Sequence, residues 1–333
     1  MTTLTRILAL PVRALSWIGG RGAPAIAALV FIGVAVPPLG ELLKPYVTEA
    51  IFLLLCISFM RVDLGALRNY LRRPGLVIAA TAWTTLAVPA TIGLVSLGLG
   101  ADTRWPDLFL ALMLQAVASP MMASPALAAV MGLDATLVLV TLVTSTALVP
   151  LTAPLFAYVF LGTALKLSPL GLGLKLAAIL SGSLLVALLL RWTFGVTAIQ
   201  RHKLAIDGIN ILVLLVFVSA VMGSVAGSLF ADPVLMIELG LSAFAVFFAL
   251  TGLSALIFRA AGPERALAIG LMVSQRNMGL MVAATDGLLP GTTWLYFALS
   301  QFPIYLSPQL LKPIVRRLTA REAAPTVAEV VDA

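Results

Sequence analysis

The chain has 333 residues, of which 61% are hydrophobic and only 11% are charged, and its mean hydropathy is +1.09. Soluble domains carry about 25% charged residues, so this composition excludes a water-soluble enzyme and a nucleic-acid-binding protein and predicts a chain embedded in a lipid bilayer. Cys56 is the only cysteine, which excludes a disulfide-linked scaffold. The net charge of +7 indicates membrane orientation rather than a binding partner, because basic residues of membrane proteins gather in cytoplasmic loops.

Apolar segments close to the ~20 residues that cross a hydrocarbon core follow one another along most of the chain. Residues 1–22 precede them and are expected to form a helix on the membrane surface, and residues 320–333 follow as a polar cytoplasmic tail. Asp134 is expected to cap the helix that starts after it. Ten segments are predicted, at residues 23–43, 47–60, 74–99, 106–132, 135–161, 170–192, 208–230, 233–258, 263–288 and 292–315. The sequence therefore predicts an all-α integral membrane protein.

The basic residues predict how these spans are oriented. Most of the 21 Lys and Arg residues fall on the same side as the N-terminus, and only Lys44, Arg104 and Lys166 fall in the opposite loops. By the positive-inside rule both termini are cytoplasmic, and the expected location is the inner (plasma) membrane. Lys175 and Arg276 remain at membrane depth; Lys175 is near a helix end and can reach the interface, whereas Arg276 cannot easily do so.

The fourth and ninth segments share a pattern that indicates an inverted repeat. Each begins with proline and an acid and later loses its apolar regularity, at SPMMASP from Ser119 and at SQRNMGL from Ser274. The two segments enter the membrane from opposite sides, so the halves are 23–161 and 170–317. Broken helix at membrane depth is tolerated where it is buried in protein or lines a cavity, which predicts a transport site where the breaks meet. The alternative is that the prolines only kink their helices.

Three stretches of the chain resemble one transporter family. The stretch CISFMRVDLGALRNYLRRPGLVI from Cys56, the SPMMASP break and above all SQRNMGL are similar to the bile acid:sodium symporter family and its wider superfamily, over residues 23–317. The resemblance implies a panel domain from spans one, two, six and seven, and a core domain in which the broken spans four and nine cross. It also implies secondary transport of organic anions, most often coupled to sodium.

Most residues that the resemblance assigns to sodium binding are replaced here. Met272 stands at the acidic position of the ninth span, and Val138 and Leu142 stand at two hydroxyl positions of the fifth. A hard cation prefers oxygen ligands, so these replacements predict weak sodium sites. Backbone carbonyls could still hold one ion together with a set of hydroxyls, Thr84, Thr141, Thr144 and Ser145. Sodium coupling therefore stays an alternative, and no other cofactor or metal is expected.

Arg276 is the leading candidate for binding an anion. An arginine near the bilayer centre costs at least ~2.5 kcal/mol on insertion scales, so it is expected to have a partner or a function. Its guanidinium would hold a carboxylate, sulfonate or phosphate and could replace a sodium ion as the fixed charge. The alternative is that it caps carbonyls of the broken helix or pairs with Asp286 or Glu238. The predicted substrate-binding set is Arg276, Asn277, Gln275, Ser274, Ser119 and Ser124.

Other function classes have less support in the sequence. A membrane-embedded enzyme needs clustered acids or a catalytic histidine, and this chain has neither DxxD nor HExxH, and has a single histidine, His202, between Arg201 and Lys203. We therefore predict a secondary active transporter of a small or amphipathic organic anion that works by alternating access, with no nucleic-acid partner. A sodium-coupled symporter, a membrane-embedded enzyme and a non-transporting sensor remain alternatives, and the substrate, the transport direction and the oligomeric state stay open.

Overall fold

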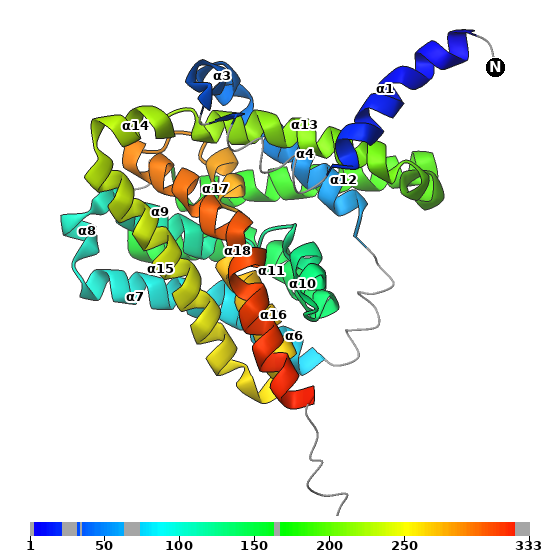
Figure 1. Cartoon of the computed structure of the whole chain (residues 1–333). Coiled ribbons are helices and arrows are strands. Elements are labelled where there is room, and N and C mark those ends of the chain that lie inside the picture. The colour runs from blue at the N-terminus through cyan, green and yellow to red at the C-terminus, as the bar shows by residue number, and fades with distance from the viewer. Residues whose placement is uncertain (1–2, 22–31, 34, 63–73, 163–166, 324–333) are drawn as a thin grey trace, which may run out of the picture. The chain divides into compact units, whose positions relative to one another are not determined.

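The structure is a computed structural model that describes residues 3–21, 32–33, 35–62, 74–162 and 167–323 (Figure 1). The structure does not describe residues 23–31 and 34 of the predicted span 23–43, the basic residues Arg68, Arg72, Arg73 and Lys166, or residues 324–333 of the predicted tail.

Helix is the only regular secondary structure in these residues, apart from one isolated antiparallel bridge. The α-helices are α1 (Thr3–Gly19), α3 (Pro37–Leu43), α4 (Val47–Met60), α6 (Pro74–Ala82), α7 (Val88–Gly98), α8 (Ala101–Arg104), α9 (Pro106–Val117), α10 (Ser124–Met131), α11 (Ala135–Phe156), α12 (Pro169–Arg201), α13 (Lys203–Met222), α14 (Val225–Ala231), α15 (Pro233–Ile257), α16 (Pro263–Ser274), α17 (Met278–Ala284) and α18 (Gly291–Ala323). The shorter elements are two 3₁₀ turns, η1 (Lys44–Tyr46) and η4 (Arg259–Ala261), and two π-helical turns, η2 (Trp83–Ala87) and η3 (Ala157–Leu161).

The chain is a multi-pass membrane protein. Within the described residues, six helical segments are long and apolar enough to cross a bilayer, namely Pro37–Met60, Pro74–Gly98, Ala135–Leu161, Pro169–Arg201, Lys203–Ala231 and Pro233–Ile257. The remaining predicted spans do not meet this criterion, each for its own reason. Spans four and nine are divided into shorter helices, and α18 carries Gln301 and Gln309 among its apolar residues. Residues 23–31 and 34 of span one lie outside the described residues.

Three helices differ in their bounds from the predicted segments. Spans one and two were expected to be separated by a loop at Lys44, but η1 joins α3 to α4 directly, because Pro45 lies in the first turn of η1, where its missing N–H is not needed. Span six was expected to end at residue 192, but α12 continues to Arg201 through a non-helical residue, Gly195, with φ 76°. The last residues of α18, which ends at Ala323, are the first residues of the predicted polar tail 320–333.

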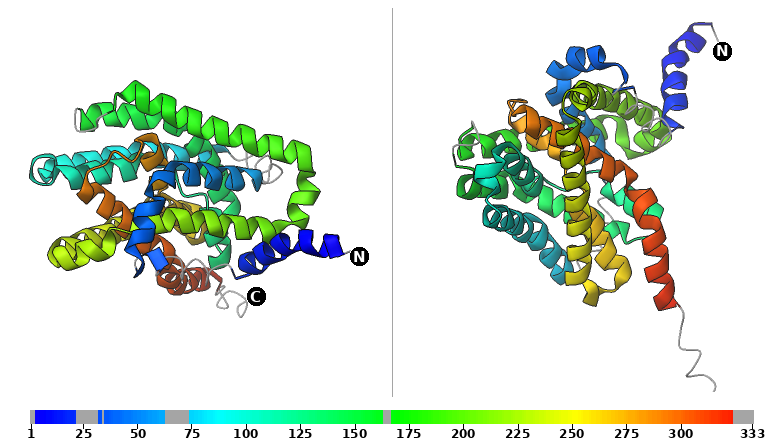
Figure 2. Two further views of the ribbon diagram at one scale, coloured as in Figure 1. Left: turned by 90° about the horizontal axis from the view of Figure 1, so that it is seen from above. Right: turned by 60° about the vertical axis from the view of Figure 1, so that its left-hand side comes forward.

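The chain divides into two compact units, each built from separated stretches of sequence. The first unit comprises Met1–Val62, Ala153–Glu238 and Gly279–Ala298. Within it α4 packs against both α12 and α13, as Figure 2 shows on its left, and α1 packs against α13. Glycine permits that second approach, because a Cβ on Gly208 would lie 2.0 Å from the Leu15 carbonyl oxygen.

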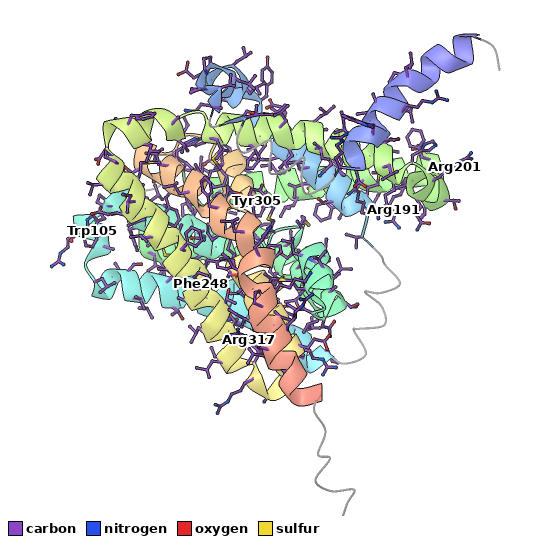
Figure 3. All side chains as sticks on the ribbon, viewed as in Figure 1. Trp105, Arg191, Arg201, Phe248, Tyr305 and Arg317 are labelled. Atoms are coloured by element: carbon purple, nitrogen blue, oxygen red, sulfur yellow. The ribbon has the colours of Figure 1, made fainter. Side chains whose placement is uncertain are left out.

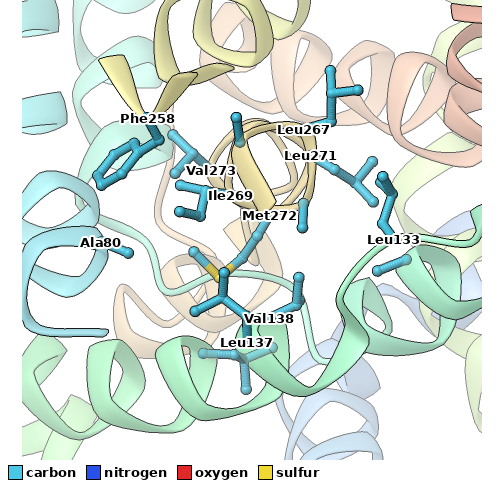
Figure 4. Close-up of a cluster of buried hydrophobic side chains, with 14 of the residues drawn as sticks. Ala80, Leu133, Leu137, Val138, Phe258, Leu267, Ile269, Leu271, Met272 and Val273 are labelled. Carbon is cyan, nitrogen blue, oxygen red and sulfur yellow. The ribbon is translucent and has the colours of Figure 1, made fainter. Parts of the chain in front are cut away.

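The second unit comprises Asp63–Thr152, Leu239–Met278 and Leu299–Ala333. Its core is a cluster of apolar side chains around α16, in which the Met272 side chain is directed toward Leu137 and Val138 of α11 (Figure 4). The predicted cap of α11 is confirmed, because the Leu137 N–H donates to Asp134 Oδ1 at 2.9 Å. This unit contains α9, α10 and α16, the residues at which spans four and nine are interrupted, and all the candidate site residues.

Candidate functional site

The predicted breaks in spans four and nine are confirmed, and the two helices break in the same way. α9 and α16 each begin with proline and an acid, run for 12 residues, and end at an extended residue, Ala118 in one and Gln275 in the other. The helices resume as α10 at Ser124 and as α17 at Met278. Pro125 lies in the first turn of α10, where its missing N–H is not needed.

The two breaks are joined to each other through their backbones. Pro120 and Arg276 form an antiparallel bridge, and both of its hydrogen bonds come from neighbouring residues. Met121 N–H donates to the Gln275 carbonyl at 2.8 Å, and Asn277 N–H donates to the Ser119 carbonyl at 2.8 Å. This register explains why proline is tolerated at position 120, since the bridge does not require an N–H there. The expectation that the two breaks lie close together is confirmed.

The Arg276 side chain donates to carbonyls from three segments. Its Nε donates to Val273 O at 2.7 Å, Nη1 to Ala118 O at 3.0 Å, and Nη2 to Thr84 O at 3.2 Å. Val273 lies at the end of α16, Ala118 follows α9, and Thr84 lies in η2. This is the capping arrangement that the sequence left open as an alternative to substrate contact. A guanidinium carries five N–H donors, so one N–H on each terminal nitrogen is not used by these three bonds.

These carbonyls lack their usual helical donors. In η2 each carbonyl accepts from the N–H five residues later, as the Val88 N–H donates to Trp83 O. The corresponding donor for Thr84 O would be residue 89, which is proline and has no N–H. Val273 O loses its ordinary donor because the Asn277 N–H is directed to Ser119. A buried carbonyl without a donor costs about 1–3 kcal/mol, so the guanidinium stabilises the chain where these carbonyls have lost their donors.

The charge of Arg276 is buried without an ionic partner. Its side chain is 2% exposed, and among the described residues no carboxylate forms an ion pair with it. The alternative partner Asp286 instead pairs with Lys175. A buried charge of this kind is costly and is most often functional.

The other predicted substrate-binding residues differ in whether their side chains have partners. Gln275 Nε2 donates to Ser307 Oγ of α18 at 2.8 Å, and Ser274 Oγ donates to Leu271 O within its own helix. The Ser119 and Ser124 hydroxyls are buried and have no hydrogen-bond partner in the described part of the chain. These two hydroxyls therefore keep unused hydrogen-bonding capacity within the described residues.

The predicted ion-binding residues form two groups. Thr84 Oγ1 donates to Ala80 O at 2.6 Å, and Thr144 shares a hydrogen bond of 2.8 Å with Thr81, so these hydroxyls already have partners. Thr141 and Ser145 lie one turn apart on α11 and are buried, and the described residues offer their hydroxyls no partner.

The residues at the replaced sodium positions lie together in an apolar environment. Met272, Val138 and Leu142 all belong to the buried cluster around α16, and each is at most 1% exposed. Figure 4 shows the Met272 side chain directed toward Leu137 and Val138. A sodium ion placed among these side chains would find no oxygen ligands from them.

Sequence reasoning missed several residues that complete this region. The carbonyls of Ala118 and Val273 were missed because every residue has a carbonyl, and only the fold shows which ones lose their donors. Thr81 and Ser307 carry a signal, because each lies among polar residues at helical spacing within an apolar segment. Tyr305, labelled on α18 in Figure 3, has a buried hydroxyl that no described residue hydrogen-bonds.

Comparison with known proteins adds no further assignment. No protein-family model matches the chain, and no curated protein matches it.

Proposed function

We propose that this protein is a secondary transporter that moves a small or amphipathic organic anion across the inner membrane by alternating access. The proposal includes a divergent relationship to the bile acid:sodium symporter superfamily, ten spans in two inverted repeats at 23–161 and 170–317, and cytoplasmic termini. The observation that carries it is the antiparallel contact between two interrupted helices beside the buried Arg276 guanidinium. Paired helix breaks of this kind are the usual setting of a transporter's binding site.

The anion in this proposal binds at the joined breaks. The Arg276 guanidinium supplies positive charge and two unused N–H donors, and the unpartnered hydroxyls of Ser119 and Ser124 supply further donors. A carboxylate, sulfonate or phosphate has the acceptors that this set of donors requires. The chemical class of the substrate is therefore an organic anion.

Transport is independent of sodium in this proposal, because Met272, Val138 and Leu142 pack in an apolar cluster where the resembling family presents oxygens. Sodium-coupled uptake is the second candidate. It is favoured by the buried hydroxyls of Thr141 and Ser145, which have no partner among the described residues.

A thermal-shift screen of the purified protein against organic anions, followed by flux measurements in proteoliposomes, tests the proposal. A ligand at 100 times its Kd stabilises the folded state by about 2.7 kcal/mol whatever the direction of transport. We expect a ligand that raises the melting temperature equally in sodium and in choline chloride at equal ionic strength, and that crosses the vesicle membrane. A saturable sodium requirement would support the second candidate. Binding without flux would indicate a sensor, and chemical conversion of the ligand would indicate an enzyme.

A further inference from the structure

The environment of the Arg276 guanidinium has the composition of a cation site. Its three acceptors are backbone carbonyl oxygens from segments far apart in sequence, Thr84, Ala118 and Val273, at 2.7 to 3.2 Å. Neutral carbonyl oxygens that converge in a buried space are typical ligands of a monovalent cation in transporters and channels.

The ends of two helices add a negative potential at the same place. Val273 O lies in the last turn of α16, and Ala118 O directly follows the last residue of α9. Each helix C-terminus is equivalent to about −0.5 of an elementary charge, so the two together offset about one positive charge. The described residues supply no carboxylate to do so, which leaves the helix ends and carbonyls as the compensating groups.

We propose that the carbonyls of Thr84, Ala118 and Val273 form a monovalent-cation site that the chain fills with its own Arg276 guanidinium, and that free guanidinium binds there when this side chain is removed. Arg276 is then a tethered cation. The proposal does not depend on what the protein transports or on whether it transports.

Arg191 offers a matched comparison within the same chain. Its Nη1 also donates to two carbonyls, Met60 O at 3.0 Å and Val62 O at 2.8 Å, at the end of α4 (Figure 3). Arg191 is only partly buried, however, so water can replace its hydrogen bonds. A free guanidinium ion therefore has little to gain at that position.

The test measures the melting temperatures of Arg276→Ala and Arg191→Ala in 0 to 20 mM guanidinium chloride, with choline chloride keeping the ionic strength constant. We expect Arg276→Ala to melt about 5 °C or more below the unsubstituted protein, and guanidinium to recover a saturable part of that loss. Arg191→Ala and the unsubstituted protein should show no saturable rise. A parallel series in sodium and potassium chloride shows whether simple cations also bind. No saturable rise in Arg276→Ala with guanidinium, or an equal rise in Arg191→Ala, would overturn the proposal.

A second pair of variants decides the question if Arg276→Ala cannot be purified. Arg276→Lys keeps a positive charge at the carbonyls, whereas Arg276→Met keeps most of the side-chain volume without charge or donors. Replacing a buried ionic group with an apolar one of similar volume is often neutral or stabilising when the charge has no specific role. We expect Arg276→Lys to be more thermostable than Arg276→Met. A Met variant as stable as the Lys variant or more stable would show that the site does not require a cation.

Discussion

The backbone N–H of Asn277 donates to the carbonyl of Ser119 across 158 residues of sequence, at 2.8 Å, and this bond joins the interruptions of two helices. Each interruption leaves carbonyls and amides that lipid cannot satisfy. Here backbone hydrogen bonds between the two breaks satisfy some of these groups, and the Arg276 side chain donates to the Ala118 carbonyl. Neither break is therefore expected to be stable without the other.

The bridge between the breaks should tolerate loss of Pro120 and not loss of the Met121 N–H. Pro120→Ala leaves both bridge hydrogen bonds in place, because the donors are Met121 and Asn277. Met121→Pro removes one donor and leaves the buried Gln275 carbonyl unpaired, which costs about 1–3 kcal/mol. Thermal melting of the two purified variants measures this difference, and equal stability of both would contradict the assigned register.

The unpartnered serine hydroxyls should contribute to binding and not to stability. Ser119→Ala and Ser124→Ala each remove a buried hydroxyl without a described partner, so the free energy of unfolding should stay unchanged or rise by about 1 kcal/mol. Affinity for the anion found in the screen should fall about tenfold, because a hydrogen bond to a charged group is lost.

Ser307→Ala is the control for these serine variants. Its hydroxyl accepts from Gln275 Nε2, so its loss leaves a buried donor unpaired and should lower stability by about 1–3 kcal/mol. If Ser119→Ala and Ser124→Ala were destabilised as much as Ser307→Ala, their hydroxyls would have partners within the protein.

The packing of α16 against α15 should depend on Gly270. A Cβ at this position would lie 2.5 Å from the Thr251 carbonyl oxygen, so Gly270→Ala forces the helices apart and should cost about 1–3 kcal/mol. Gly252→Ala lies on the same helix as Thr251 and meets no atom within 4 Å, so its stability should be unchanged or slightly higher. Thermal melting distinguishes the two, and a neutral Gly270→Ala would show that the helices are not packed this closely.

Anion affinity should depend on the charge of Arg276. Arg276→Gln should weaken binding about tenfold or more, and Arg276→Lys should recover only part of the loss, because an ammonium group does not reproduce the two parallel N–H donors. Melting temperature and ligand affinity should be measured on the same preparation, with Arg191→Gln as a control that keeps affinity. If a folded Arg276→Gln variant kept the same affinity, Arg276 would not contact the anion, and its role would be only to hydrogen-bond the three carbonyls.

Local chemistry was sufficient to predict the membrane class and the positions of the helix breaks. Long apolar segments predict spans from composition alone, and Pro120, Pro125 and the polar run around Arg276 weaken helix wherever they occur. The Asp134 cap is equally local, because its partner Leu137 is three residues away. Features of this kind depend on neighbours along the chain, so the sequence alone was enough to predict them.

Tertiary structure decided the partners across the breaks. Thr84 lies 192 residues from Arg276, and its carbonyl accepts that bond only because η2 and Pro89 remove its helical donors. The sequence showed that Met272, Val138 and Leu142 lack oxygens, but only the packing of α11 against α16 shows that they share one apolar cluster. The physical reason is that backbone carbonyls and side-chain methyl groups are chemically alike along the whole chain, so nothing in the sequence marks the ones that will meet. Which ones meet is determined by the three-dimensional path of the backbone, not by any local pattern.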